Sequence, residues 1–99
     1  MKIIINKPED GTVNAVVEGS IDTLTSQNFE NEIEKNIDGA KKLIIDLEKV
    51  DYVSSAGLRA LLGLNSKMEV QGEMIIKNVC ESVKEVFEMT GFDEILTIQ

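Results

Sequence analysis

The strongest limit on the fold comes from residues 43–62, which pass from a strand pattern into a helix pattern through two adjacent serines. Residues 43–47 read LIIDL, a short apolar run that is typical of a strand buried on both faces of a sheet. After Ser54 and Ser55, apolar residues return at helical spacing, at Leu58, Leu61, Leu62 and Met68. On residue chemistry alone, the simplest interpretation of either serine is an N-cap, whose oxygen accepts from the free N–H groups of the first turn.

Strand and helix patterns alternate along the rest of the chain. Short apolar runs predict further strands at residues 2–6, 12–18, 73–77 and 94–98. The first two runs flank the turn-forming sequence PEDG, so they should form an N-terminal hairpin. A helix capped by Asp22 or Thr23 should carry one apolar stripe, made of Leu24, Phe29, Ile33 and Ile37. Another helix is expected over residues 82–89.

This alternation predicts an α/β fold in which most neighbouring strands are parallel and the crossovers are right-handed. We expect one domain over residues 1–99, with a mixed sheet of four to five strands, an N-terminal hairpin and about three to four helices. A hydrophobic content of 42% is enough for one modest core of this kind.

Charge and hydropathy limit the classes of partner and compartment. Eighteen acidic residues against ten basic residues give a net charge of −8, which disfavours nucleic acid and anionic membranes as partners. A basic protein surface is the natural complement. No apolar run is long enough to span a bilayer, and residues 1–7 turn polar too early for a signal peptide, so we expect a cytoplasmic protein.

The chain does not carry the usual residues of an enzyme active site. It contains no histidine, which removes the common general base at neutral pH, and it has neither a nucleophile-elbow motif nor a glycine-rich phosphate loop. The lone Cys80 has no companion for a disulfide or a zinc site. We therefore expect no catalysis, no metal and no cofactor.

One catalytic alternative remains open at this stage. Asp46, at the end of a predicted parallel strand, could accept a phosphoryl group beside Asp22 and Asp51 with a bound magnesium ion. Such a site resembles a response-regulator receiver. The chain lacks the paired acids expected after the first strand and is about one βα unit short of a doubly wound sheet, so this alternative is the weaker one.

Two motifs resemble those of STAS domains, specifically the bacterial anti-sigma-factor antagonists. The first is the sequence DYVSSAGLR at residues 51–59, and the second is EGSID at residues 18–22, which is similar to the Gly-x-(Ile/Leu)-Asp loop of the family. The apolar run at residues 43–47 precedes the first motif, as it does in the family. The resemblance covers nearly the whole chain in order and spacing.

The resemblance implies a phosphorylation switch rather than an enzyme. In that family, a partner that is both anti-sigma factor and serine kinase phosphorylates a serine or threonine at the start of this helix. The unphosphorylated antagonist binds the kinase and frees the sigma factor, and a PP2C-type phosphatase restores it. The implied partner-binding residues in this chain are Asp22, Thr23, Ser54, Ser55, Gly57 and Leu58.

The phosphorylated position follows from how this chain departs from the family pattern, Asp-Ser-(Ser/Thr)-Gly-Leu. Ser54 replaces the aspartate, Ser55 holds the first hydroxyl position, and Ala56 fills the second. The resemblance therefore implies phosphorylation of Ser55, with Ser54 as the second choice. We expect the Ser55 hydroxyl to be exposed, with Ser55 as the cap of a helix that begins near Ala56.

A third hypothesis is a STAS subunit that serves as a structural adaptor, for example in a transporter or a multi-protein stress complex, without regulated phosphorylation. Phosphate chemistry separates the three hypotheses. Phosphoserine survives acid, an acyl phosphate on Asp46 does not, and an adaptor carries neither modification.

Overall fold

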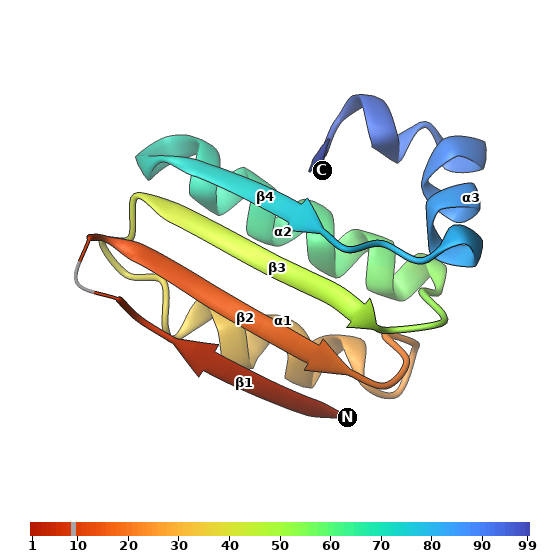
Figure 1. Ribbon diagram of the computed structural model, residues 1–99, viewed down its shortest axis with the longest axis horizontal. Coiled ribbons are helices and arrows are strands. Elements are labelled where there is room, and N and C mark those ends of the chain that lie inside the picture. Colours follow the sequence, from red (N-terminus) through yellow and green to blue (C-terminus); the bar gives the residue numbers. More distant parts are fainter. Residues whose placement is uncertain (9) are drawn as a thin grey trace.

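The computed structural model describes every residue of the chain except Glu9, and these residues form an α/β fold around one five-stranded sheet (Figure 1). The strands are β1 (Lys2–Asn6), β2 (Thr12–Glu18), β3 (Lys42–Lys49), β4 (Glu73–Lys77) and β5 (Thr97–Ile98). The helices are α1 (Ser26–Glu34), α2 (Ser55–Gln71) and α3 (Glu81–Thr90), and a short 3-10 helix, η1 (Phe92–Glu94), precedes β5. The predicted fold class is confirmed.

The strands lie in the order β1-β2-β3-β4-β5. The pair β1 and β2 is antiparallel, as the predicted hairpin requires, and every later pair is parallel. The turn predicted at residues 8–11 includes Glu9, which lies outside the described residues. Because β2, β3 and β4 run in the same direction, their carboxyl ends meet at one end of the sheet, where α3 also packs (Figure 1).

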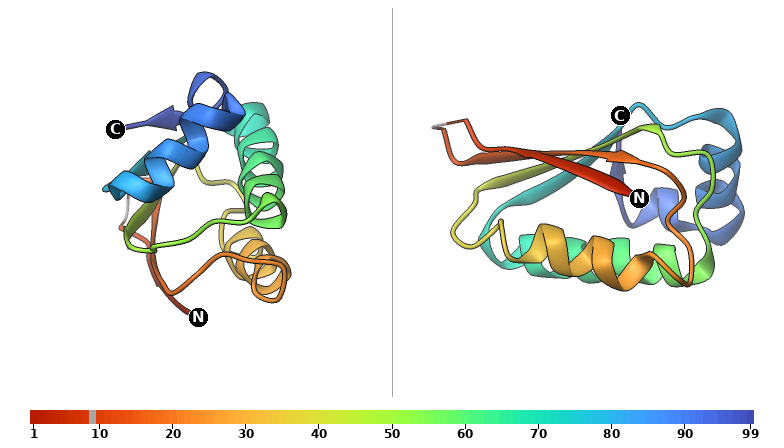
Figure 2. Two further views of the ribbon diagram at one scale, coloured as in Figure 1. Left: turned by 90° about the vertical axis from the view of Figure 1, so that its right-hand side faces the viewer. Right: turned by 90° about the horizontal axis from the view of Figure 1, so that it is seen from below.

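Helices α1 and α2 cover the same face of the sheet, as the two views of Figure 2 show. Alternate residues of β3 therefore have different environments. Leu43, Ile45 and Leu47 are fully buried, whereas Ile44 and Asp46 are only half-buried. The prediction that this strand is buried on both faces was wrong, because the crossover helices leave the second face uncovered. The fully buried side chains of Phe29, Leu61 and Met68 belong to the same core.

Helix α1 begins later than the apolar pattern predicts. Residues 22–25 form a turn, the helix starts at Ser26, and the Leu24 side chain is 91% exposed instead of belonging to the apolar stripe. Phe29 and Ile33 are buried as predicted. Hydrogen bonds local to this turn, described below, compete with the first helical turn and explain the difference.

The predicted strand at residues 94–98 is shorter than expected. Only Thr97 and Ile98 pair with β4. The Phe92 carbonyl oxygen accepts hydrogen bonds from the N–H groups of Ile95 at 3.1 Å and Leu96 at 2.8 Å, so these donors are not available to a strand ladder. Among the described residues, none of the helices has the length and apolar character needed to cross a membrane.

Candidate functional site

The loop between β3 and α2 ends in a serine cap at the carboxyl end of the parallel strands. Ser54 has extended backbone angles (φ −84°, ψ 175°), and its Oγ accepts a hydrogen bond from Gly57 N–H at 3.2 Å. Its carbonyl oxygen accepts from Leu58 N–H at 2.9 Å. Ser54 is therefore the N-cap, and the helix begins at Ser55. The predictions that Ser55 is the cap and that the helix begins near Ala56 were wrong by one residue.

Ser55 is the first residue of α2, and it is exposed. No other residue in the described part of the chain forms a hydrogen bond with its hydroxyl. The backbone N–H groups of Ser55 and Ala56 also have no acceptor among the described residues, as expected for the first positions of a helix. The start of α2 thus presents a free hydroxyl beside free N–H donors.

Gly57 and Leu58 pack the first turn of α2 against the rest of the molecule. A Cβ atom on Gly57 would lie 2.5 Å from the Ile21 carbonyl oxygen and 2.9 Å from Val53 Cγ1, so the missing side chain allows α2 to approach the loop after β2. The Leu58 side chain is only 5% exposed and belongs to the core. Leu58 was expected to contact a partner, and its burial corrects that prediction for the side chain.

The loop after β2 is a tight turn held by Asp22 and Thr25. Asp22 Oδ1 accepts from the backbone N–H groups of Leu24 at 2.9 Å and Thr25 at 3.0 Å. The Thr25 hydroxyl accepts from Asp22 N–H at 2.9 Å and donates to the Ser20 carbonyl oxygen at 2.7 Å. Thr23 is exposed at the tip of this turn. Asp22 Oδ1 is thus occupied by hydrogen bonds within the turn.

The fold brings the two sequence motifs side by side. Ile21 and Val53 form a parallel bridge, Ile21 N–H donates to the Tyr52 carbonyl oxygen at 2.9 Å, and Ser54 N–H donates to the Ile21 carbonyl oxygen at 2.9 Å. Sequence reasoning placed Asp22 and the serines in one site, but it missed Thr25 and Tyr52. The spacing of Asp22 and Thr25, an acidic residue and a hydroxyl three residues apart, is a turn signal that could have identified Thr25.

Asp46 does not form the magnesium site of the receiver-like alternative. Its Oδ1 accepts from Glu48 N–H at 3.0 Å, and its Oδ2 accepts from the Asn78 amide at 3.0 Å. Asp51 Oδ1 lies instead beside the Ser20 hydroxyl, at 3.4 Å. Within the described residues, no group of three histidine, cysteine, aspartate or glutamate side chains is arranged to hold a metal ion.

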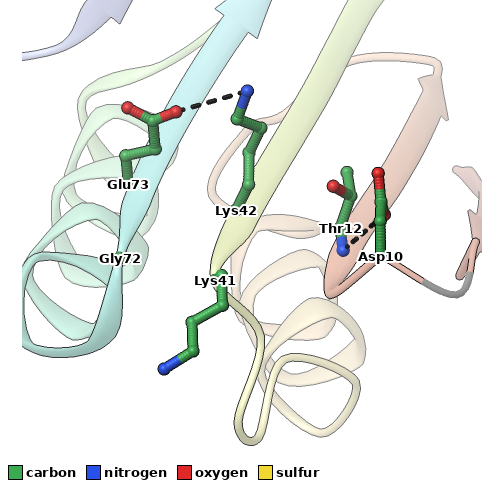
Figure 3. A pocket seen from close by; sticks show the side chains of 6 residues that line it. All are labelled: Asp10, Thr12, Lys41, Lys42, Gly72 and Glu73. Carbon is green, nitrogen blue, oxygen red and sulfur yellow. Dashed lines mark hydrogen bonds and ion pairs between the residues drawn. The ribbon is translucent and has the colours of Figure 1, made fainter.

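A hollow lies at the opposite end of the sheet, where β3 and β4 begin (Figure 3). It has a volume of about 530 Å³ and is lined by Asp10, Thr12, Lys41, Lys42, Gly72 and Glu73. Lys42 Nζ lies 3.3 Å from Glu73 Oε1, and Asp10 Oδ1 accepts from Thr12 N–H at 3.1 Å. Lys42 and Glu73 pair with each other, Asp10 is bonded within its own turn, and the hollow is remote from the serines, so we assign no ligand to it.

The two serines should differ in their effect on stability. We expect Ser54→Ala to lower the free energy of unfolding by about 1 kcal/mol, because it removes the cap bond to Gly57 N–H. Ser55→Ala should change it by less than about 0.5 kcal/mol, because the Ser55 side chain is exposed. Urea unfolding of both variants measures the difference. Equal losses would show that the two hydroxyls share the cap.

Because of the turn at Asp22, the free energy of unfolding should depend on pH in the acidic range. Burial raises the pKa of the Asp22 carboxyl, but hydrogen bonds from Thr25 and Leu24 outweigh burial and hold the pKa below its ordinary value. The carboxylate therefore stabilises the fold above the unfolded pKa of about 3.9, and this contribution is lost as pH falls through the folded pKa.

Asp22→Asn provides the test, because the amide oxygen can still accept in the turn but does not titrate. Between pH 5 and pH 3, wild type should lose more stability in urea unfolding than Asp22→Asn. The Asp10 carboxyl, whose pKa is also lowered by its bonds to Thr12, remains in both proteins and cancels in the comparison. Identical losses would mean that the Asp22 bonds do not favour its charged form.

Comparisons with known proteins agree on one family. The family model for the STAS domain matches residues 5–99. BtrV of Bordetella bronchiseptica, described as a candidate anti-sigma factor antagonist, is 34% identical over 100 residues, covering 99% of this chain and 85% of that protein.

Solved structures share the fold. An anti-sigma factor antagonist from Mycobacterium paratuberculosis has a TM-score of 0.87 at 23% identity, covering 98% of this chain and 83% of that one. The Bacillus cell fate determinant SpoIIAA in its phosphorylated form has a TM-score of 0.74 at 21% identity, covering 99% of this chain and 91% of that one.

Proposed function

The chain belongs to the STAS domain family, and we propose that it is an anti-sigma factor antagonist controlled by phosphorylation of Ser55. In this proposal, the unphosphorylated chain binds an anti-sigma factor that is also a serine kinase, and the bound kinase releases its sigma factor. Phosphorylation ends the interaction, and a PP2C-type phosphatase restores it. The name of the Bordetella relative and the phosphorylated form of the structural neighbour support this proposal.

The observation that carries the proposal is that the two serines differ in exposure and in hydrogen bonding. Ser54 is half-buried and its Oγ is occupied by the cap bond, whereas Ser55 is exposed and its hydroxyl is free of hydrogen bonds within the described residues. A kinase can therefore reach Ser55 without breaking the helix cap. Phosphorylation of Ser54, the second choice, would modify the oxygen that already accepts the cap bond from Gly57 N–H.

The chemistry of the step is a phosphoryl transfer in which this chain is the substrate. The Ser55 oxygen attacks the γ-phosphorus of ATP held by the kinase, a new O–P bond forms, and ADP leaves. The hydroxyl proton passes to a base of the kinase. The chain contributes only an accessible hydroxyl on a rigid helix start.

The start of α2 can accommodate the product without unfolding. A phosphoserine adds about −1.5 to −2 charges near neutral pH. The free N–H groups of Ser55 and Ala56 and the positive end of the helix dipole favour an anion there. Arg59 is exposed and lies one helical turn beyond Ser55, at the spacing that favours an ion pair with an anion.

The same phosphate should weaken a protein interface. A partner packed against the start of α2 would have to desolvate a bulky dianion that its neighbours in this chain neutralise only in part, and burying such a charge is costly. Phosphorylation would thus leave the fold intact and change the surface, which is what a partner switch requires.

The experiment that tests the proposal is affinity capture from the native host, followed by reconstitution. Purified chain retains its partners from lysate, mass spectrometry identifies them, and each is incubated with the chain and ATP. We expect capture of an anti-sigma factor of the serine kinase class and an acid-stable phosphate on Ser55. An unmodified chain bound to a transporter or stress complex would favour the adaptor. An acid-labile phosphate on Asp46 would favour the receiver.

A further inference from the structure

We propose that Leu24 is the anchor by which this chain docks on its anti-sigma factor, in an apolar pocket bordered by basic side chains. The inference rests on the proposed function and names the contact that would give the complex its affinity. Neither the apolar pattern nor the two motifs identified Leu24 as a surface residue, since the pattern placed it in the core.

The Leu24 side chain is 91% exposed, more than any other large apolar side chain described in the structure. A single exposed apolar side chain is ordinary on a protein surface, but Leu24 combines its exposure with a turn fixed by hydrogen bonds and a second exposed apolar side chain on the adjoining loop. Tyr52, on the adjoining loop, is 54% exposed and adds an aromatic ring of the kind that is enriched at interface hot spots.

The backbone that carries Leu24 is fixed before any partner arrives. Leu24 N–H donates to Asp22 Oδ1, and the Thr25 hydroxyl ties both ends of the turn together through Asp22 N–H and the Ser20 carbonyl oxygen. A side chain on a preorganised turn loses less conformational freedom on binding than one on a flexible loop. The turn therefore has the properties of a docking element.

Leu24, Tyr52 and Ser55 lie at the same end of the molecule. The loop that carries Leu24 is joined to the segment 52–54 at Ile21, through the carbonyl and N–H groups of that residue. Both loops follow the carboxyl ends of neighbouring parallel strands, β2 and β3 (Figure 1). A partner that reaches the Ser55 hydroxyl would approach the surface from which Leu24 projects.

The charges around this end indicate the chemistry of the occupant. Glu48 near the end of β3 and Asp51 on the loop after it are exposed, and so are the basic residues Lys49 and Arg59. Lys49 already pairs with Glu18 at 3.8 Å, and the whole chain has a net charge of −8. These carboxylates would repel nucleic acid and an anionic membrane, but they complement basic side chains around an apolar pocket. A protein partner with that surface is the occupant that fits.

The test compares Leu24→Ser with a matched control, Val70→Ser. Val70 is 89% exposed, but it lies near the opposite end of α2. The probe is the recombinant anti-sigma factor of the host that wild-type chain captures. By calorimetry, Leu24→Ser should weaken binding by about tenfold or more, as loss of an interface anchor does. Val70→Ser should stay within about twofold of wild type, and both variants should unfold at the wild-type temperature.

Phosphorylation kinetics give a second readout. Leu24→Ser should raise the KM of the kinase for this chain and leave kcat unchanged, because the Ser55 hydroxyl is intact. Wild-type affinity in Leu24→Ser would overturn the anchor while leaving the proposed function standing. A change in self-association instead of partner affinity would show that a second copy is the occupant. Failure of wild type to bind any anti-sigma factor would overturn both proposals.

Discussion

Replacing Ser55 with alanine should reduce phosphorylation of this chain by its kinase to background, while the fold and the partner contact persist. The Ser55 hydroxyl is the exposed one of the pair, and its removal costs no hydrogen bond among the described residues. Incubation with the captured kinase and labelled ATP, followed by phosphopeptide mapping, measures the effect. Urea unfolding of the same sample should show a stability within about 0.5 kcal/mol of wild type.

Ser54→Ala is the matched control for this result. It should still accept phosphate on Ser55, although it is less stable by about 1 kcal/mol because the cap is lost. Ser55→Asp should fold and bind the kinase poorly, since it places a negative charge at the same position. Label retained in Ser55→Ala and lost in Ser54→Ala would move the modification to Ser54.

Gly57→Ala should be strongly destabilising although alanine is the better helix former. The new Cβ would lie 2.5 Å from the Ile21 carbonyl oxygen, and a backbone atom bonded to Ser54 N–H cannot move away without disturbing the site. Overpacking of this kind typically costs about 1–3 kcal/mol, which exceeds the gain in helix propensity of about 1 kcal/mol at most sites. Urea unfolding should therefore show a net loss of stability.

Gly63→Ala is the control, because Gly63 lies on the same helix and its new Cβ would meet only the carboxylate end of the Glu30 side chain. That flexible group can rotate away, so Gly63→Ala should be neutral or stabilising by up to about 1 kcal/mol. Equal effects at the two glycines would show that the approach of α2 to the Ile21 loop is not tightly packed.

The sequence was sufficient for most elements of the fold, because local patterns determine them. The predicted bounds of β1, β2 and β4 match the structure, since short β-branched runs are flanked there by turn residues. The environment of β3 could not be predicted in the same way. Burial of Ile44 and Asp46 depends on which face of the sheet the crossover helices occupy, and that is a property of the whole fold.

The predicted start of α1 was wrong for a different physical reason. Leu24 has helical spacing with Phe29 and Ile33, but the hydrogen bonds between Asp22 and Thr25 hold residues 22–25 in a turn. Hydrophobic periodicity depends only on the positions of apolar residues. It therefore gives no information on side-chain hydrogen bonds that compete with the first turn of a helix.

At the candidate site, the sequence predicted the serine pair but not the role of each member. Backbone angles decide the cap, and they place Ser54 in the extended conformation that a cap needs. This also explains the departure from the family pattern. Aspartate and serine are both strong N-caps, so Ser54 can replace the aspartate and still receive Gly57 N–H.

The most direct test of the account is the affinity of the captured anti-sigma factor for two forms of this chain, one unmodified and one carrying phosphoserine at position 55 by semisynthesis. Circular dichroism first establishes that both forms have the same fold. Calorimetry should then show binding of the unmodified chain and at least about thirtyfold weaker binding of the phosphorylated chain, the loss expected for an unpaired charge in a desolvated contact. Equal affinities of the two forms would contradict the phosphorylation switch.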